Sequence, residues 1–500
     1  NYLVGTIITH QNDHPHKNHY LYRDSDGSGE WFFMPWDHDL TWGSNWTGSS
    51  YHDYIYADDD RVSGKPSDVK PSHPFLGKQD CQEWNYHWNH LIDALLNDAT
   101  VRQMYLRRLR TVMDELLKAP GTPYGELFIE RRIDELAAVM SRDVALDYAK
   151  WANPWSWGGQ GGYTRDQSFE YALNVLKNDY LAVRRIHLFV THNVDNAGRY
   201  NISGSYSARI PNAQPANPAI NFGNFDYNPV SGNQDEEYIQ LINPNSYAVD
   251  ISGWKLAGGV EHTFLPGTVI VADGTIFVSP NVSAFRTRAV NPTGGQGLFI
   301  QGNYKRHLSN WGETVDLLTE KDYLIDTMTY TGNPSDQQRY LRITELMYHP
   351  KQAGSYNEEE YEFIELQNIG AGPVLLDEAK LTDGIYYQFA SGGNLSLAPG
   401  DYIVLVKNRA AFAERYQTNG INIAPDVYTG SLSNSGEKIK LEDWTNSTIL
   451  EFKYNDEWYA STDGQGFSLT ITDPTNPDLD SWDKKESWRP NTSTNGSPGQ

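Results

Sequence analysis

The sequence Glu237-Tyr-Ile-Gln-Leu-Ile-Asn243 returns 125 residues later as Glu362-Phe-Ile-Glu-Leu-Gln-Asn368. In both copies an acidic residue precedes a run in which outward and inward positions alternate, which is typical of a half-buried strand. Further pairs keep nearly the same spacing: Tyr227-Asn-Pro229 with Tyr348-His-Pro350, Lys255-Leu256 with Lys380-Leu381, Phe264 with Phe389, and Phe285 with Phe412. A period this long predicts two tandem domains rather than a solenoid.

The rest of the chain divides around this repeat. After residue 200, helical periodicity nearly disappears and turn residues arrive roughly every 8 to 12 positions, as in antiparallel sandwiches. We therefore predict two immunoglobulin-like antiparallel β-sandwiches, at residues 205–333 and 340–500. Residues 1–200 mix helix and strand, so the predicted fold class is multidomain α+β, with a mostly helical lobe that contains a β-hairpin preceding the sandwiches.

Within residues 1–200 the apolar spacing predicts specific elements. Asn1–His10 has helical spacing, and the strands His19–Tyr22 and Trp31–Met34 flank a Gly-rich turn at 24–29, which predicts a hairpin. Apolar residues three and four apart predict further helices over Glu83–Leu96, Thr100–Leu117, Tyr124–Ala149 and Ser168–Val190. The polar, Pro-containing stretch 44–80 is expected to be a long surface loop.

Two motifs near the start of the chain carry the chemistry. Asp13 is followed five positions later by Asn18, and an aromatic run ends in Pro35-Trp-Asp37-His-Asp39. Enzymes of the protein-kinase type use this residue set: one Asp orients the attacking hydroxyl, an Asn holds a metal ion, and a later Asp holds metal against the phosphates. Carboxylate and amide oxygens are hard ligands that suit magnesium or manganese.

These motifs resemble the CotH kinase family. The likeness rests on Asn12-Asp13, Asn18-His-Tyr-Leu-Tyr22, Pro35-Trp-Asp37-His-Asp39-Leu-Thr-Trp-Gly43 and the helical stretch Tyr105-Leu-Arg-Arg-Leu-Arg110. The resemblance implies an atypical kinase that phosphorylates Ser or Thr with ATP and a divalent metal. It makes Asp13 the candidate catalytic base, Asn18 and Asp37 candidate metal ligands, and Asp39 a further candidate ligand. ATP binding is expected only with a nucleotide-clamping N-terminal lobe ahead of Asn1.

The two repeats resemble lamin tail domains, through the Glu-Tyr/Phe-Ile-Glu/Gln-Leu strand that ends in Asn, the segment Gly253-Trp-Lys-Leu256 and the closing Gly496-Ser-Pro-Gly499. A CotH-like region followed by lamin tail domains looks typical of secreted or cell-surface bacterial proteins. We therefore expect a protein substrate or a surface-structure partner, with the β domains as binding or structural modules. The contrasting hypothesis is a catalytically silent extracellular structural or adhesion protein.

Composition narrows the function classes. The net charge of -24 argues against nucleic acid, because duplex binders neutralise phosphates with Lys and Arg. No apolar run approaches the roughly 18 residues of a membrane span. Cys81 is the single cysteine, so an intrachain disulfide is excluded. The sequence favours no particular oligomeric state.

Three other interpretations stay open. The histidines of the first 38 residues offer a zinc site for a hydrolase: His10, His14, His16, His19 and His38. Trp36, Trp42 and Trp46 could stack on a sugar, although packing beside a cleft is the commoner role of such residues. The acidic clusters 235–237 and 358–360 are expected to be a solvated face, with calcium or a shared partner as the alternative.

Overall fold

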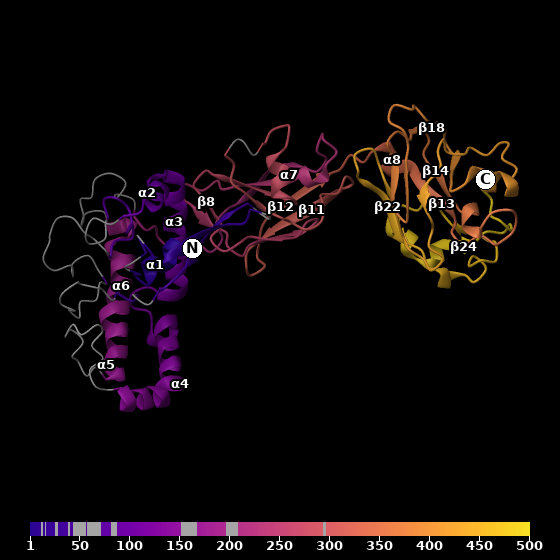
Figure 1. Cartoon of the computed structure of the whole chain (residues 1–500). Helices are drawn as coiled ribbons and strands as arrows, with labels where there is room; N and C mark the ends of the chain where they lie inside the picture. Colours follow the sequence, from indigo (N-terminus) through magenta and orange to yellow (C-terminus); the bar gives the residue numbers. More distant parts are fainter. Residues whose placement is uncertain are drawn as a thin grey trace.

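The computed structural model describes residues 1–11, 14–15, 17–25, 29–38, 41–43, 57, 72–81, 88–151, 168–196, 209–293 and 297–500. Figure 1 shows three bodies in a row, a helical N-terminal region and then two β-sandwiches. Asn1 lies where the first two bodies meet, and its side-chain amide donates to the carbonyl of Pro266 at 2.7 Å. The C-terminus lies in the last body.

The N-terminal region is built mainly from helices, as predicted. Its elements are α1 (Tyr2–Ile8), α2 (His90–Asn97), α3 (Ala99–Val112) with a π-helical turn (Met113–Leu117), a 3-10 turn (Tyr124–Glu126), α4 (Phe128–Trp151), α5 (Phe169–Asn174), a π-helical stretch (Val175–Leu181), α6 (Ala182–Ile186), a second π-helical stretch (His187–Thr191) and a 3-10 turn (Val194–Asn196). The segments from Phe169 to Thr191 follow one another without a break, and α4 and α5 form an arm that projects from the body (Figure 1).

One helix starts later than predicted. The expected helix over 83–96 begins at His90, because the Asn89 side chain accepts hydrogen bonds from the main-chain nitrogens of Leu91 and Ile92. Such an N-cap satisfies donors that have no partner inside the helix and so fixes its first turn. Residues 82–87 lie outside the described residues.

The core of this region contains a segment that was predicted to lie on the surface. Phe75 and Leu76 are each 1% exposed and pack among α1, α2, α3 and the 169–191 helices. The Tyr105 hydroxyl donates to the carbonyl of Pro74 at 2.5 Å. The prediction of a surface loop over 44–80 is therefore wrong for 72–78, because side chains far along the chain supply the hydrogen bonds that this polar segment needs when buried.

The predicted hairpin is confirmed. Strands β1 (His19–Arg23) and β2 (Trp31–Pro35) pair antiparallel, with His19 opposite Pro35 and Arg23 opposite Trp31. Part of the turn, residues 26–28, lies outside the described residues.

The first sandwich has two four-stranded sheets, β10-β9-β4-β3 and β12-β11-β6-β7. Its strands are β3 (Asn221–Asp226), β4 (Tyr238–Ile242), β5 (Val249–Asp250), β6 (Lys255–Gly258), β7 (His262–Thr263), β8 (Val269–Ile270), β9 (Thr275–Ser279), β10 (Ile300–Gly302), β11 (Gly312–Leu318) and β12 (Leu324–Thr331), with α7 (Val282–Arg286) between β9 and β10.

The second sandwich follows α8 (Asp336–Tyr340) and has two five-stranded sheets, β19-β14-β13-β23-β24 and β20-β17-β16-β21-β22. Its strands are β13 (Leu341–Met347), β14 (Phe363–Asn368), β15 (Val374–Leu375), β16 (Lys380–Asp383), β17 (Ile385–Gln388), β18 (Ser396–Leu397), β19 (Tyr402–Val406), β20 (Thr429–Gly430), β21 (Lys438–Glu442), β22 (Thr448–Lys453), β23 (Leu469–Ile471) and β24 (Trp488–Pro490), with α9 (Arg409–Arg415) after β19.

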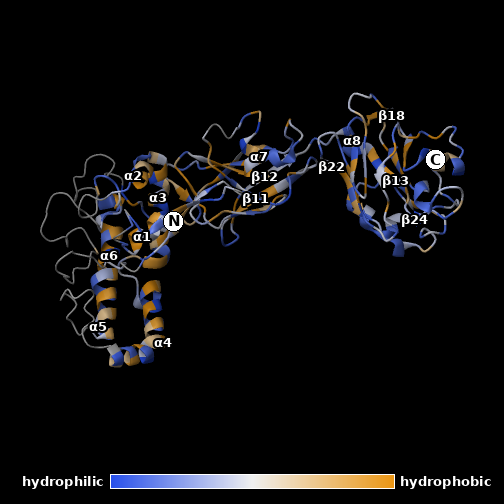
Figure 2. Ribbon diagram, viewed as in Figure 1, coloured by the Kyte–Doolittle hydropathy of each residue, from blue (hydrophilic) through white to orange (hydrophobic). Residues whose placement is uncertain are grey.

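The strand orders of the two sandwiches correspond, so the predicted repeat is confirmed. Strand β4 lies between β9 and β3, as β14 lies between β19 and β13, and the orders β12-β11-β6-β7 and β22-β21-β16-β17 match. Figure 2 shows strands that carry both hydrophobic and hydrophilic residues, as expected for sheets with one buried face. The second copy differs by adding β23 and β24 beside β13. The predicted fold class, a helical lobe with a hairpin followed by two antiparallel sandwiches, is confirmed.

Candidate functional site

The candidate site is built where α1 ends and where β2 ends. The main-chain carbonyl of Asp37 accepts hydrogen bonds from the Asn18 side-chain amide at 3.1 Å and from the Gln11 side-chain amide at 3.2 Å. The main-chain nitrogen of Trp36 donates to the carbonyl of Asn18 at 3.0 Å. Two of the predicted metal ligands, Asn18 and Asp37, are therefore neighbours even though 18 residues separate them in the sequence.

Both neighbours have an unusual main-chain conformation. Asn18 has φ 66° and Asp37 has φ 52°, in the left-handed region that Asn and Asp enter more readily than other non-glycine residues. This conformation turns the chain sharply at each residue. Such backbone geometry persists only where surrounding contacts enforce it, and functional sites are where it gathers.

The loop that leads to the site is anchored at its start. The main-chain nitrogen of Gln11 donates to the carbonyl of Thr6 at 2.8 Å. The main-chain nitrogen of Trp42 donates to the carbonyl of Thr9 at 2.6 Å, so the end of α1 and the segment after β2 are held together. The Tyr180 hydroxyl donates to the carbonyl of Ile8 at 2.6 Å. Arg184, fully buried, donates to the carbonyl of Ile7 at 3.1 Å and to that of Ser72 at 2.7 Å.

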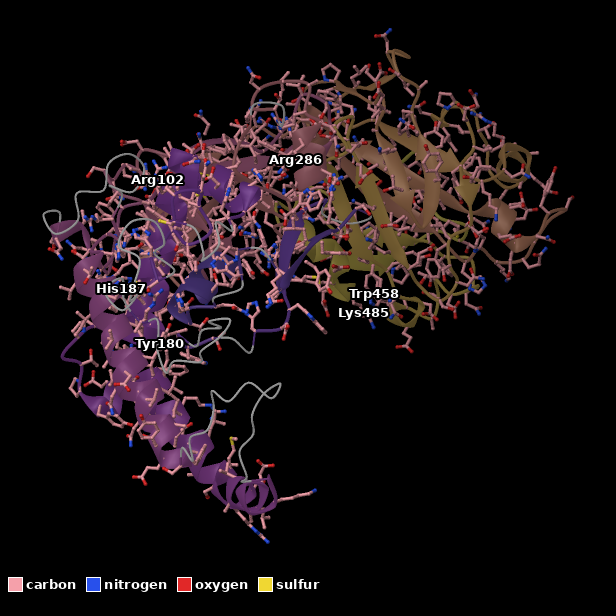
Figure 3. The ribbon with its side chains drawn as sticks, turned by 60° about the vertical axis from the view of Figure 1, so that its left-hand side comes forward. Arg102, Tyr180, His187, Arg286, Trp458 and Lys485 are labelled. Atoms are coloured by element: carbon pink, nitrogen blue, oxygen red, sulfur yellow. The ribbon has the colours of Figure 1, made fainter. Side chains whose placement is uncertain are left out.

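Tyr180 and Arg184 are site-positioning residues that sequence reasoning missed. Both lie on the continuous helical segment 169–191, which we call the 169–191 helical stack, and Figure 3 labels Tyr180 and His187 on it. They are more than 170 residues away in sequence from the loop that they hold. Their helical spacing of four places both on one helix face, which is a signal of shared orientation. That signal does not identify α1 as the partner.

Two of the four predicted site residues lie outside the described residues, namely the candidate base Asp13 and the candidate ligand Asp39. That they share a cleft with Asn18 and Asp37 therefore stays a prediction. Among the residues that the structure describes, no group of three or more His, Cys, Asp and Glu side chains is arranged to hold a metal ion. The two described candidates contribute hard oxygen donors of the kind that magnesium and manganese take.

The histidines proposed for zinc gather around an aromatic ring. The Tyr2 ring centroid lies 6.4 Å from that of His14, 5.7 Å from that of His19 and 6.2 Å from that of His38, and Tyr2 stacks on Phe33 at 4.8 Å. Burial raises the pKa of Tyr2 to about 12. His14, His19 and His38 thus contribute to aromatic packing around Tyr2, and His16 lies outside the described residues.

Of the three tryptophans considered for sugar stacking, the two that the structure describes do not share a surface. Trp42 packs edge-on against Tyr180 with ring centroids 5.9 Å apart, as part of the core. Trp36 is 63% exposed and its nearest described ring is that of Tyr20, at 6.4 Å. Trp46 lies outside the described residues. The packing role holds for Trp42.

The acidic clusters of the sandwiches are only partly a solvated face. Glu237 is fully buried and accepts hydrogen bonds from the Tyr304 hydroxyl at 3.1 Å and from the Leu308 nitrogen at 2.8 Å. Glu362 likewise accepts from the Tyr428 hydroxyl at 3.2 Å and from the Leu432 nitrogen at 2.9 Å. The prediction that Glu237 and Glu362 point the same way is confirmed, and the expectation of a solvated face is wrong for Glu237.

A junction joins the helical region to the first sandwich. On α3, Arg107 Nε donates to the carbonyl of Ala248 at 2.8 Å, and Arg108 forms an ion pair with Asp250 at 3.1 Å. The Arg108 side chain also donates to the Asn1 side-chain oxygen at 2.9 Å. The start of α1 and the first sandwich are thus attached to the same arginine.

Comparison with known proteins assigns the regions. Residues 1–187 match the family model described as CotH kinase protein, and residues 213–332 and 334–456 each match the Lamin Tail Domain model. No curated protein matches the chain significantly.

One solved structure, from work on the inhibition of the exo-beta-D-glucosaminidase CsxA by a glucosamine-configured castanospermine, is 14% identical over 45% of this chain and 25% of that chain, with a TM-score of 0.12. The chain spans only a quarter of the length of that protein, and so low a score carries no argument. The assignment rests on the two family models: this chain carries a CotH kinase region at residues 1–187, followed by two lamin tail domains.

Proposed function

We propose that this protein is a secreted or cell-surface kinase that transfers phosphate from ATP to Ser or Thr residues of an extracellular protein, and that its lamin tail domains bind a partner or position the kinase region. The family match supports the reaction class. Within the described part of the chain no helix combines the length and the apolar character needed to cross a bilayer.

The observation that carries the proposal is the meeting of Asn18 and Asp37 through the Asp37 carbonyl. In kinase-type phosphoryl transfer the protein supplies position and charge neutralisation, so the side chains that hold metal must be fixed relative to each other. The shared carbonyl, the second bond from Gln11 and the anchoring by Tyr180 and Arg184 provide that fixation.

Each candidate side chain receives one role. Asp13 orients the substrate hydroxyl and accepts its proton, and the side-chain oxygens of Asn18, Asp37 and Asp39 bind magnesium or manganese. A bound divalent ion would neutralise charge on the transferred phosphate. Adenine and the β-phosphate must be clamped for transfer, and we expect ATP to bind productively only when a nucleotide-clamping N-terminal lobe accompanies this region.

Radiolabelled ATP and a basic Ser-rich peptide test the proposal. We compare the 500-residue chain with a longer chain that carries a nucleotide-clamping lobe ahead of Asn1. We expect negligible transfer by the first and clear transfer by the second. In the longer chain, Asp37→Ala should reduce transfer at least a hundredfold, because metal and phosphate lose a fixed anion.

Asp322→Ala is the matched control, since it removes a carboxylate that is 66% exposed on the first lamin tail domain. It should leave the rate unchanged. Transfer that survives Asp37→Ala would remove the metal role of that residue. No transfer by the longer chain, with both metals supplied, would favour the catalytically silent structural protein.

A further inference from the structure

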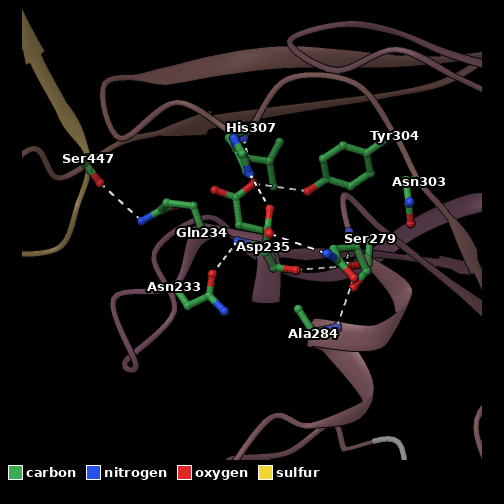
Figure 4. A network of polar contacts seen from close by, with 12 residues as sticks. Asn233, Gln234, Asp235, Ser279, Ala284, Asn303, Tyr304, His307 and Ser447 are labelled. Carbon is green, nitrogen blue, oxygen red and sulfur yellow. Dashed lines mark hydrogen bonds and ion pairs between the residues drawn. The ribbon is translucent and has the colours of Figure 1, made fainter. Parts of the chain in front are cut away.

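The two lamin tail domains present equivalent sockets at one end, of which one is filled within the chain. We define socket 1 by residues 232–235 and 307–310, and socket 2 by residues 357–360 and 431–434. The turn at 443–447 of the second domain lies in socket 1 (Figure 4). The side-chain amides of Gln234 and Asn310 donate to the Ser447 hydroxyl at 3.1 and 2.8 Å. The Asn446 amide donates to the carbonyl of Gly232 at 2.9 Å.

The framework behind socket 2 repeats that of socket 1 contact by contact. In the first domain Ser309 is bonded through its nitrogen to Glu313 at 2.8 Å and through its carbonyl to the Tyr330 hydroxyl at 2.8 Å. In the second, Ser433 is bonded to Glu437 at 2.6 Å and to Tyr454 at 2.7 Å in the same way. Together with the equivalent bonds of Glu237 and Glu362, this makes socket 2 a preformed copy of a surface that binds a protein turn.

Socket 1 borders a cleft of about 690 Å³ into which the 443–447 turn reaches, whereas no turn of the described chain is bonded to socket 2 in that way. Socket 2 contains a cleft of about 550 Å³ lined by Gln352, Asn357, Glu358, Glu359, Glu362, Leu432 and Asn434. Asn434, the equivalent of Asn310, is exposed, whereas Asn310 is only 6% exposed because the second domain covers it. Glu362 is 1% exposed and lines the cleft, and only one of its two carboxylate oxygens, Oε2, has a hydrogen-bond partner among the described residues.

The two sockets differ in the charge of the side chain that faces the occupant. Socket 1 offers the amide donor of Gln234 to a hydroxyl, but the equivalent position in socket 2 is the carboxylate Glu359. The next residue fixes this equivalence, because Glu360 accepts from the Asn408 side chain as Asp235 accepts from that of Asn281. Glu359 and Glu362 line the same cleft, while Lys407, 3.3 Å from Glu359, and His349, 3.7 Å from Glu358, are the cations beside these carboxylates in the described structure. An occupant must therefore donate hydrogen bonds and carry positive charge, because charge-assisted bonds to carboxylates are the strong ones.

We infer that socket 2 is a docking site for a basic turn of a partner protein, in which a Lys or Arg side chain takes the place that Ser447 takes in socket 1. The inference does not depend on the proposed kinase activity. It explains why Gln234 is replaced by an acid in the domain whose socket stays open. The second lamin tail domain would then bind a protein turn through socket 2, as the first domain binds the 443–447 turn through socket 1.

The test uses the intact 500-residue chain and two cyclic peptides with the sequence 442–448, one natural and one carrying Ser447→Lys. Socket 1 is filled by the chain itself, so the peptides report on socket 2. We expect the Ser447→Lys peptide to bind at least tenfold more tightly than the natural one by fluorescence anisotropy. In Glu359→Gln, which restores the amide that Gln234 supplies in socket 1, that preference should fall at least fivefold. The matched control Glu320→Gln removes an exposed charge on the first domain and should leave it unchanged.

Carbodiimide coupling followed by mass spectrometry locates the contact, because it joins a carboxylate to a lysine amine that touches it. Coupling at Glu358 or Glu359 supports the proposal. Coupling spread over the acidic surface, equal affinity in Glu359→Gln and the unmodified chain, or no binding by either peptide would overturn it. Calcium chloride is also titrated alone, and tight calcium binding that Glu359→Gln abolishes would overturn the proposal in favour of an ion site.

Discussion

At the scale of single residues, the two lamin tail domains each keep a carboxyl group in their interior. Burial raises the pKa of Glu237 to about 9 and that of Glu362 to about 7, against the hydrogen bonds that favour the charged form. The Coulombic attraction of Lys407 also lowers the pKa of Glu362, whereas the negative charges of Asp226 and Glu313 raise the pKa of Glu237 further. The same framework therefore holds a neutral acid in the first domain and a titrating one in the second at neutral pH.

This difference predicts how stability depends on pH. The unfolded chain releases the Glu237 proton near pH 4.3, whereas the folded chain keeps it to about pH 9. Between these values the folded state binds one proton more, so the free energy of unfolding falls as pH rises, by at most about 1.4 kcal/mol for each pH unit. Glu237→Gln should remove this slope and raise the melting temperature of the first domain at pH 8 while changing it little at pH 4.5.

Glu362→Gln serves as the matched variant. The rise in melting temperature that it causes should grow with pH only up to about pH 7, where Glu362 ionises in the folded chain. Differential scanning calorimetry from pH 4.5 to 8.5 measures the melting temperatures of both variants. An equal melting temperature of Glu237→Gln and the unmodified chain at pH 8 would show that Glu237 ionises in the folded state.

The sequence predicted the position of these acids but not their burial. The repeat places Glu237 and Glu362 at the same point of the same strand, which follows from period and alternation alone. A run such as Asp235-Glu-Glu237 is usually a solvated face, and that expectation is wrong for Glu237. Its partners Tyr304 and Leu308 lie 67 and 71 residues away, and no local pattern reports such distant hydrogen bonds.

At the scale of elements, the candidate site depends on how α1 is held by the 169–191 helical stack. α1 is only seven residues long, so its own hydrogen bonds cannot keep it folded. Tyr180 and Arg184 bind its last carbonyls, which a helix leaves without internal partners. Asn18 and Asp37 were predictable as ligands from motif chemistry, whereas this support, like the burial of 72–78, depends on residues distant in sequence.

Arg184→Met should therefore unfold the N-terminal region more easily. It removes the charged donor from the buried carbonyls of Ile7 and Ser72, which keep only the His10 nitrogen at 3.3 Å and His187 Nε2 at 3.0 Å, and each bond to a charged group is worth about 1.5–3 kcal/mol. Hydrogen exchange should speed up in α1 and in 72–78 and stay unchanged in both sandwiches. Arg132→Met, on the exposed face of α4, should have almost no effect. Unchanged protection of α1 in Arg184→Met would contradict the anchoring role.

At the scale of the whole molecule, the three bodies are joined in series, and the two junctions use different kinds of side chain. Arginines of α3 bind the first lamin tail domain, and neutral amides bind the turn of the second. The arginine-rich stretch Tyr105–Arg110 was recognisable as a family element, but its contact with Ala248 and Asp250 was not, because those partners lie more than 140 residues away. The order of the domains was predictable, while their mutual attachment was not.

The arginine junction predicts a specific loss of order between domains. Asp250 is 2% exposed and faces Arg108, which is 14% exposed, so the ion pair is shielded from solvent and is worth more than a surface pair. The double variant Arg107→Ala/Arg108→Ala removes both contacts and leaves the Asp250 carboxylate without its cation. We expect small-angle X-ray scattering to show a larger radius of gyration and proteolysis to become faster near residues 209–215.

Arg102→Ala is the matched control, because Arg102 lies on the same helix (Figure 3) but donates to the carbonyls of Leu96 and Asn97 within the N-terminal region. It should leave the scattering curve unchanged. Circular dichroism must show that the double variant keeps its helices, so that a larger radius reports separation of folded domains. Scattering identical to that of the unmodified chain would mean that these two arginines do not hold the junction, and that the remaining contacts of α3 with strands β5 and β8 are sufficient.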